Sequence, residues 1–70
     1  MNEIEIREGD EFIKLGQALK KAGIAESGVD AKFMIEDGLI TINGEIENRR
    51  GKKLYPGDEF EFEGEIFKVV

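Results

Sequence analysis

The apolar residues of this chain change their spacing along the sequence, and this change constrains the fold more than any other feature. Between residues 12 and 37 they recur at helical spacing, whereas from residue 39 onward they alternate with polar residues, as in half-buried strands. Residues 2–7 also alternate. We therefore predict an α+β fold in which an N-terminal strand precedes a pair of helices and a small antiparallel β-sheet.

The ends of the two helices are marked by capping residues. Asp10 is the expected N-cap of the first helix and Gly23 its end, while Ser27, with Asp30 three positions later, fits a capping box at the start of the second helix, which ends at Gly38. The residues on the inward faces predict the core, which comprises Phe12, Leu15, Leu19, Met34, Ile35, Ile40, Ile42 and Phe60.

Three turn signals divide the second half of the chain into strands. Asn43-Gly44 is the strongest short hairpin signal, Pro56-Gly57-Asp58 predicts a turn, and Gly64-Glu65 is the expected two-residue turn of the last hairpin. The 70 residues show no linker or repeat, so we expect one domain over residues 1–70.

The composition excludes several classes of function. The chain has no cysteine and no histidine, which excludes disulfides, thiolate metal sites, cysteine nucleophiles and histidine bases. It has neither a dense carboxylate loop for a metal ion nor a glycine-rich nucleotide motif. We therefore expect no catalytic residues, no metal and no cofactor. The acidic N-terminus and the lack of a long apolar stretch predict a cytoplasmic protein that does not enter a membrane.

A basic segment, residues 49–53, interrupts an otherwise acidic chain. Residues 1–11 hold five acids and one arginine (−4), residues 12–53 eight bases and six acids (+2), and residues 54–70 five acids and one lysine (−4), which sum to the net −6. Because a polyanion responds to the local field, the middle of the chain is a candidate surface for RNA, although many such clusters are only solvated loops. Its cations are Arg49, Arg50, Lys52 and Lys53, and we expect them to lie within one exposed loop near the cationic face of the first helix.

Side chains on the two helices are candidates to extend this surface. Lys14, Gln17 and Lys21 fall opposite the apolar stripe of the first helix. Phe33 lies beside Lys32 on the outer face of the second helix, where an exposed aromatic ring is able to stack on a base. The alternative for Phe33 is packing against a neighbouring element.

The pattern of both helices and the first hairpin resembles the RNA-binding domain of the ribosomal protein S4 type, and in particular its small stand-alone bacterial members. The residues that carry the resemblance are Phe12-Ile13-Lys14-Leu15-Gly16-Gln17-Ala18-Leu19, Ser27-Gly28-Val29-Asp30-Ala31-Lys32, Ile35, Gly38, Ile40, Ile42-Asn43-Gly44, Arg49-Arg50-Gly51-Lys52-Lys53-Leu54 and Pro56-Gly57-Asp58. The hallmark of that family is the αL motif, a pair of helices beside a hairpin. It would span about residues 12–62 here.

The resemblance implies a non-catalytic module that binds structured RNA, most often ribosomal or transfer RNA. The residues it implies, with those suggested by charge, are Lys14, Gln17, Lys21, Ser27, Lys32, Phe33, Asn48, Arg49, Arg50, Lys52 and Lys53. This chain departs from the family at Gly28, Val29 and Glu36, where basic residues are common. Fewer ion contacts imply weaker binding than that of the ribosomal members.

One further function remains open at this stage. The alternative is a protein-interaction adaptor that keeps the fold but has lost most RNA affinity, with the acidic strand at residues 59–63 facing a basic ribosomal or replication protein. A sulfur carrier of the ubiquitin-like type is excluded, because the chain ends in Lys68-Val69-Val70 and not in the required Gly-Gly.

Overall fold

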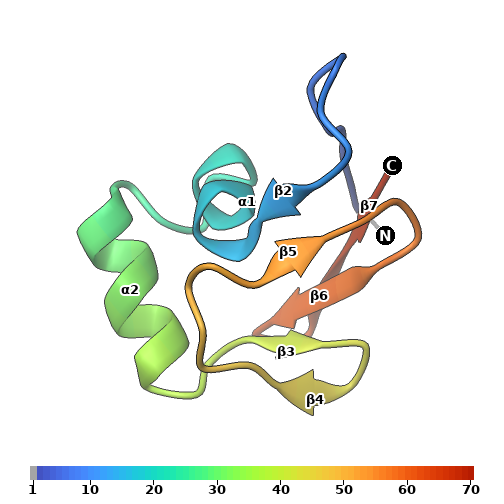
Figure 1. Cartoon of the computed structure of the whole chain (residues 1–70). Helices are drawn as coiled ribbons and strands as arrows, with labels where there is room; N and C mark the ends of the chain where they lie inside the picture. The colour runs from blue at the N-terminus through green and yellow to red at the C-terminus, as the bar shows by residue number, and fades with distance from the viewer. Residues whose placement is uncertain (1) are drawn as a thin grey trace.

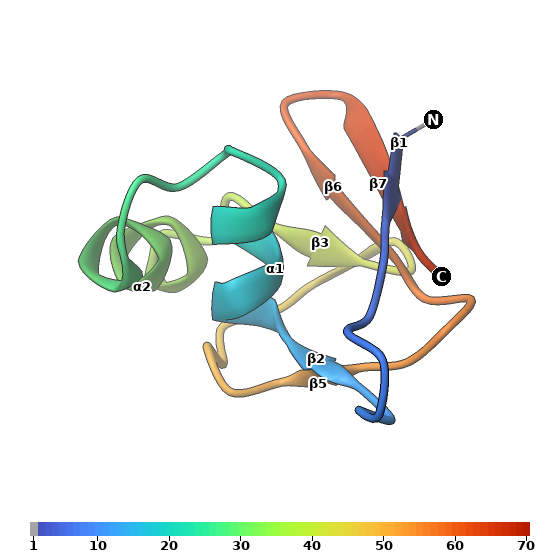
Figure 2. The same ribbon diagram turned by 90° about the horizontal axis from the view of Figure 1, so that it is seen from above.

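The computed structural model describes residues 2–70 and combines two helices with two small sheets (Figure 1). The helices are α1 (Leu15–Lys21) and α2 (Gly28–Glu36). The strands are β1 (Asn2–Ile4), β2 (Ile13–Lys14), β3 (Thr41–Ile42), β4 (Glu45–Ile46), β5 (Lys53–Leu54), β6 (Glu59–Phe62) and β7 (Glu65–Val69). The view from above shows α1 between α2 and the strands (Figure 2). The predicted α+β fold, with its pair of helices and its sheet, is confirmed.

The main sheet is mixed. Its strand order is β1-β7-β6-β3-β4, with β1 parallel to β7 and the other pairs antiparallel. The N-terminal strand was predicted from its alternation, but its partner is set at long range, where Asn2 lies opposite Phe67 and Ile4 opposite Val69. The first and last strands of the chain therefore lie side by side at one edge of the sheet (Figure 2).

A second sheet of two short strands changes where the first helix begins. Ile13 and Lys14 pair with Leu54 and Lys53, so α1 starts at Leu15 and its N-cap is Lys14. The prediction that Asp10 caps this helix is wrong, because the pairing with β5 holds residues 13–14 in extended backbone. The cap of α2 is confirmed: the Asp30 N–H donates to Ser27 Oγ at 3.2 Å.

The turn residues behave as expected at two of the three predicted turns. Asn43 and Gly44 have φ of 50° and 89°, as a tight hairpin with two left-handed residues requires. Gly57 has φ of 100° in the predicted Pro56-Gly57 turn. The last hairpin turns one residue earlier than predicted, at Glu63-Gly64, because Phe62 pairs with Glu65.

The core lies between the helices and the main sheet. It contains Ile4, Leu15, Ala18, Leu19, Ala25, Ala31, Ile35, Ile40, Ile42, Leu54, Phe60, Phe67 and Val69. Phe60 and Phe67 stack with ring centroids 5.1 Å apart. Two residues of the predicted core are only half-buried. Met34 packs at the edge of the core, and Phe12 precedes the helix and lies against Tyr55 instead.

Candidate functional site

The basic segment, Arg49–Lys53, is fixed to the beginning of α1 by backbone hydrogen bonds. The Leu15 N–H donates to the Lys52 carbonyl at 2.8 Å, and the Gly16 N–H donates to the Arg50 carbonyl at 3.1 Å. The first amides of a helix have no partner within the helix, and no side chain caps α1. The segment therefore satisfies these amides and holds its own side chains beside the helix.

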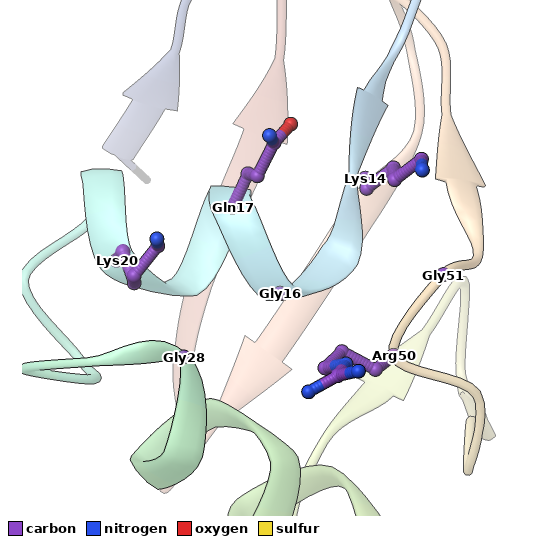
Figure 3. A pocket seen from close by; sticks show the side chains of 7 residues that line it. All are labelled: Lys14, Gly16, Gln17, Lys20, Gly28, Arg50 and Gly51. Atoms are coloured by element: carbon purple, nitrogen blue, oxygen red, sulfur yellow. The ribbon is translucent and has the colours of Figure 1, made fainter.

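Gly16 allows the chain to approach this closely. A β-carbon at position 16 would lie 2.9 Å from Cγ of Arg50, nearer than packed atoms normally come. The missing side chain leaves room for the stem of Arg50, which passes from the segment into the space beside α1 and α2 (Figure 3). Gly16 therefore has a packing role that the helical pattern did not suggest.

An open groove of about 340 Å³ lies where α1, α2 and the basic segment meet (Figure 3). It is lined by Lys14, Gly16, Gln17, Lys20, Gly28, Arg50 and Gly51. Three of these residues are cations that come from three different parts of the chain, and none of the lining residues within the described chain is acidic. The groove is therefore a local positive surface on a chain of net charge −6.

The helical pattern predicted Lys21 as an RNA contact and assigned no role to Lys20. Lys20 lies one turn after Gly16 and shares its face of α1, so it lines the groove. Lys21 points toward the N-terminal segment, where its Nζ donates to the carbonyl oxygen of Glu5. The close contact between Gly16 and Arg50 shows which face of α1 looks into the groove, and that contact is invisible in the helical pattern alone.

The prediction that the four cations of the basic segment share one exposed loop is wrong. Arg50 lines the groove, while Arg49 Nε pairs with Glu47 Oε2 at 3.0 Å. Lys52 is half-buried and lines a different hollow with three acids, which are Glu45, Glu47 and Asp58. Lys53 belongs to β5, where its ammonium lies 4.8 Å from the ring centroid of Phe12. Each cation therefore has its own surroundings.

The remaining predicted residues lie on or near α2 and its flanks. Ser27 Oγ is engaged as the helix cap, and Asn48 is exposed. Lys32 is exposed one turn after Gly28, about 40° around the helix from that groove residue. Phe33 is 57% exposed, which excludes its packing in the core, and it lies about 140° from Gly28. Phe33 therefore points away from the groove.

The Glu47–Arg49 pair gives a testable pH dependence. Hydrogen bonding from Arg49, aided by the positive charges of Arg49 and Lys52, lowers the pKa of Glu47 below its ordinary 4.5. Because the folded-state pKa is the lower one, the pair stabilises the fold above the unfolded-state pKa, and this contribution is lost as pH falls through the folded-state pKa. An NMR titration of the Glu47 carboxyl carbon should give a midpoint below 4.5.

The arginine neighbours provide the control for this titration. Arg49→Ala should move the Glu47 midpoint back toward its ordinary value, whereas Arg50→Ala should leave it unchanged. A wild-type midpoint at or above 4.5 would show that the ion pair is not formed in solution.

The described residues lack two further features. Residues 2–70 contain no group of three or more acidic side chains placed to hold a metal ion. No helix in this range has the length and apolar character needed to cross a bilayer.

The chain is similar in sequence to several known proteins. The model of a family described as the S4 domain matches residues 4–70. The chain is 48% identical over 61 residues to the probable ribosome maturation protein RlbA of Bacillus subtilis, and the match covers 86% of each chain. It is 34% identical over 58 residues to the putative RNA-binding protein YbcJ of Escherichia coli, and this match covers 83% of each chain.

A solved structure matches the fold over the whole chain. The solution structure of YbcJ from Escherichia coli, described as revealing an αL motif involved in RNA binding, superposes with a TM-score of 0.71 at 30% sequence identity. The match covers 100% of this chain and 87% of that one.

Proposed function

The chain belongs to the S4 domain family, and on this basis we propose that it binds structured RNA without catalysing a reaction. The observation that carries the proposal is the groove, in which Lys14, Lys20 and Arg50 surround Gln17 without an acidic neighbour in its lining. Three cations held on a helix, a strand end and a docked segment suit the phosphates of a folded RNA, whose spacing is set by its shape.

The likeness to named relatives supports the class of RNA. A relative called a probable ribosome maturation protein favours ribosomal RNA as the target, with transfer RNA as the second class. Lys32 and Asn48 flank the groove residues in our proposal, and Lys52, Lys53, Lys21, Ser27 and Phe33 stay predicted contacts outside its lining. Arg49 is paired with Glu47 and is expected to contribute little to RNA binding. Binding of this kind needs no cofactor and takes place in the cytoplasm.

The adaptor function has its own supporting observation. Val29 and Phe33 lie one turn apart on α2 and are 60% and 57% exposed, so an apolar strip lies on the outer side of the helix. Neighbouring exposed apolar side chains are typical of protein interfaces. An adaptor would use this strip and would bind RNA no more tightly than any acidic protein does.

Neighbouring arginines provide the experiment that tests the RNA proposal. We expect Arg50→Ala to weaken binding to a folded ribosomal RNA fragment and to lower the log–log salt slope by about 0.7–0.9, the value of one phosphate contact. Arg49→Ala removes the same charge, but Arg49 is already paired with Glu47, so its effect should be clearly smaller. Filter binding or fluorescence anisotropy over a series of salt concentrations measures both.

The outcomes separate the two functions. Equal effects of the two substitutions would mean that the groove is not the binding surface. No binding by the wild-type protein at low salt would contradict the RNA function and favour the adaptor.

A further inference from the structure

A small aromatic cluster lies next to the groove on the two-stranded sheet. The rings of Phe12 and Tyr55 are 5.9 Å apart between centroids and inclined at 52°, and the ammonium of Lys53 lies 4.8 Å from the Phe12 centroid. Tyr55 is the chain's only tyrosine. Its large side chain is 46% exposed, so part of the ring faces solvent. Phe12 is half-buried and supports the tyrosine ring from one side.

The backbone of Tyr55 is held rigidly. Its N–H donates to Asp58 Oδ2 at 2.8 Å, and its carbonyl accepts from the Asp58 N–H at 2.9 Å, which closes the Pro56-Gly57 turn. The residue before it, Leu54, is fully buried in the core. Because the backbone of Tyr55 is already fixed, the residue loses little conformational entropy when its ring binds a flat partner.

The cluster adjoins the groove through Phe12 and Lys53, while Tyr55 lies outside the lining of the groove. Lys14, which lines the groove, lies directly opposite Lys53 across the β2–β5 pair. A neighbouring hollow of about 390 Å³ is lined by Phe12 and by the groove residues Lys14 and Gln17, together with Gly9, Asp10 and Glu11. Asp10 is paired with Arg7 at 3.7 Å, so Glu11 is the carboxylate at this edge that has no ion pair within residues 2–70.

We propose that Tyr55, supported by Phe12, is a stacking platform for one unpaired base of the RNA that occupies the groove, with Lys53 and Lys14 on phosphates next to that base. The inference rests on the proposed RNA function and adds the class of target, a folded RNA with an unpaired nucleotide beside a helical stem. The two cations face each other across the β2–β5 pair, so both would hold the RNA backbone on one side of the ring. Aromatic rings stack on any exposed base. The lysines contact the phosphates through their charge, and the tyrosine ring contacts the face of the base.

A set of hairpins tests this platform. One RNA stem is compared with the same stem carrying a single-nucleotide bulge, moved along the stem from one hairpin to the next. We expect the wild-type protein to bind at least one bulged hairpin more tightly than the plain stem. Tyr55→Ala should weaken binding to that hairpin by roughly 5- to 150-fold, as the loss of one stacked base does, with the salt slope unchanged.

The ring itself provides a second readout. Since the chain has one tyrosine and no tryptophan, a base stacked on Tyr55 should quench the protein's emission, and the plain stem should quench it much less. Tyr55→Phe keeps the ring and should bind the bulged hairpin nearly as well as wild type. This variant also confirms that the weaker binding of Tyr55→Ala comes from stacking, because the phenylalanine ring preserves the packing against Phe12.

Failure of the platform and failure of the RNA function give different results. If wild type binds both kinds of hairpin equally, or if Tyr55→Ala weakens binding to both by the same factor, the platform is overturned while RNA binding stands. If wild type binds neither kind at low salt, the RNA function is overturned and the platform with it.

Discussion

Leu19→Ala is expected to lower the free energy of unfolding by about 2–5 kcal/mol. Leu19 is fully buried in α1 and belongs to the core, so truncation leaves a cavity that its neighbours fill only in part. Domains of this size have about 5–15 kcal/mol of total stability or less, so the loss is a large share of it. Urea unfolding followed by circular dichroism measures the change.

Phe33→Ala is the matched control for this prediction. It removes a larger side chain from the other helix, but Phe33 is 57% exposed and contributes little buried area. Its effect on the unfolding free energy should stay within about 0.5 kcal/mol, as for other surface changes. Comparable losses for the two variants would mean that α2 buries the face that the structure exposes.

Simultaneous removal of the three groove cations should have the largest effect on RNA binding. In the variant Lys14→Ala, Lys20→Ala, Arg50→Ala, we expect the salt slope to fall by about 2–3, at about 0.7–0.9 for each phosphate that the protein no longer neutralises. The groove would then keep Gln17 as its polar side chain with no cation in its lining. Affinity for a folded ribosomal RNA fragment at low salt should fall to the level of non-specific binding.

A second triple variant isolates position from total charge. Arg7→Ala, Arg49→Ala, Lys68→Ala also changes the net charge from −6 to −9, but these cations lie outside the groove. Arg7 and Arg49 are paired with Asp10 and Glu47, and Lys68 lies opposite Glu59 and Glu3 in the sheet. This variant should retain most of the affinity. Equal losses in the two variants would indicate that only the overall charge of the chain matters.

Local features of the fold were predictable because their causes lie within a few residues. The Ser27 cap needs only the Asp30 amide three positions later, and the Asn43-Gly44 turn needs only two residues that tolerate positive φ. The burial of Leu15, Leu19 and Ile35 follows from helical spacing. The family resemblance was visible for the same reason, since its characteristic residues are caps, turns and core positions.

The arrangement of the groove was decided by contacts between residues far apart in the chain. The pairing of Ile13 with Leu54 delays the start of α1 and removes the predicted role of Asp10, and no local pattern specifies that pairing. Gly16 and Arg50 are 34 positions apart, and their contact selects Lys20 over Lys21 as a groove residue. The sequence alone determined the two helices, the Asn43-Gly44 hairpin and the existence of a basic segment, but not the β2–β5 sheet. The tertiary structure decided which cations act together, because an electrostatic surface depends on distances in space and on the acids that neutralise each charge, as Glu47 does for Arg49.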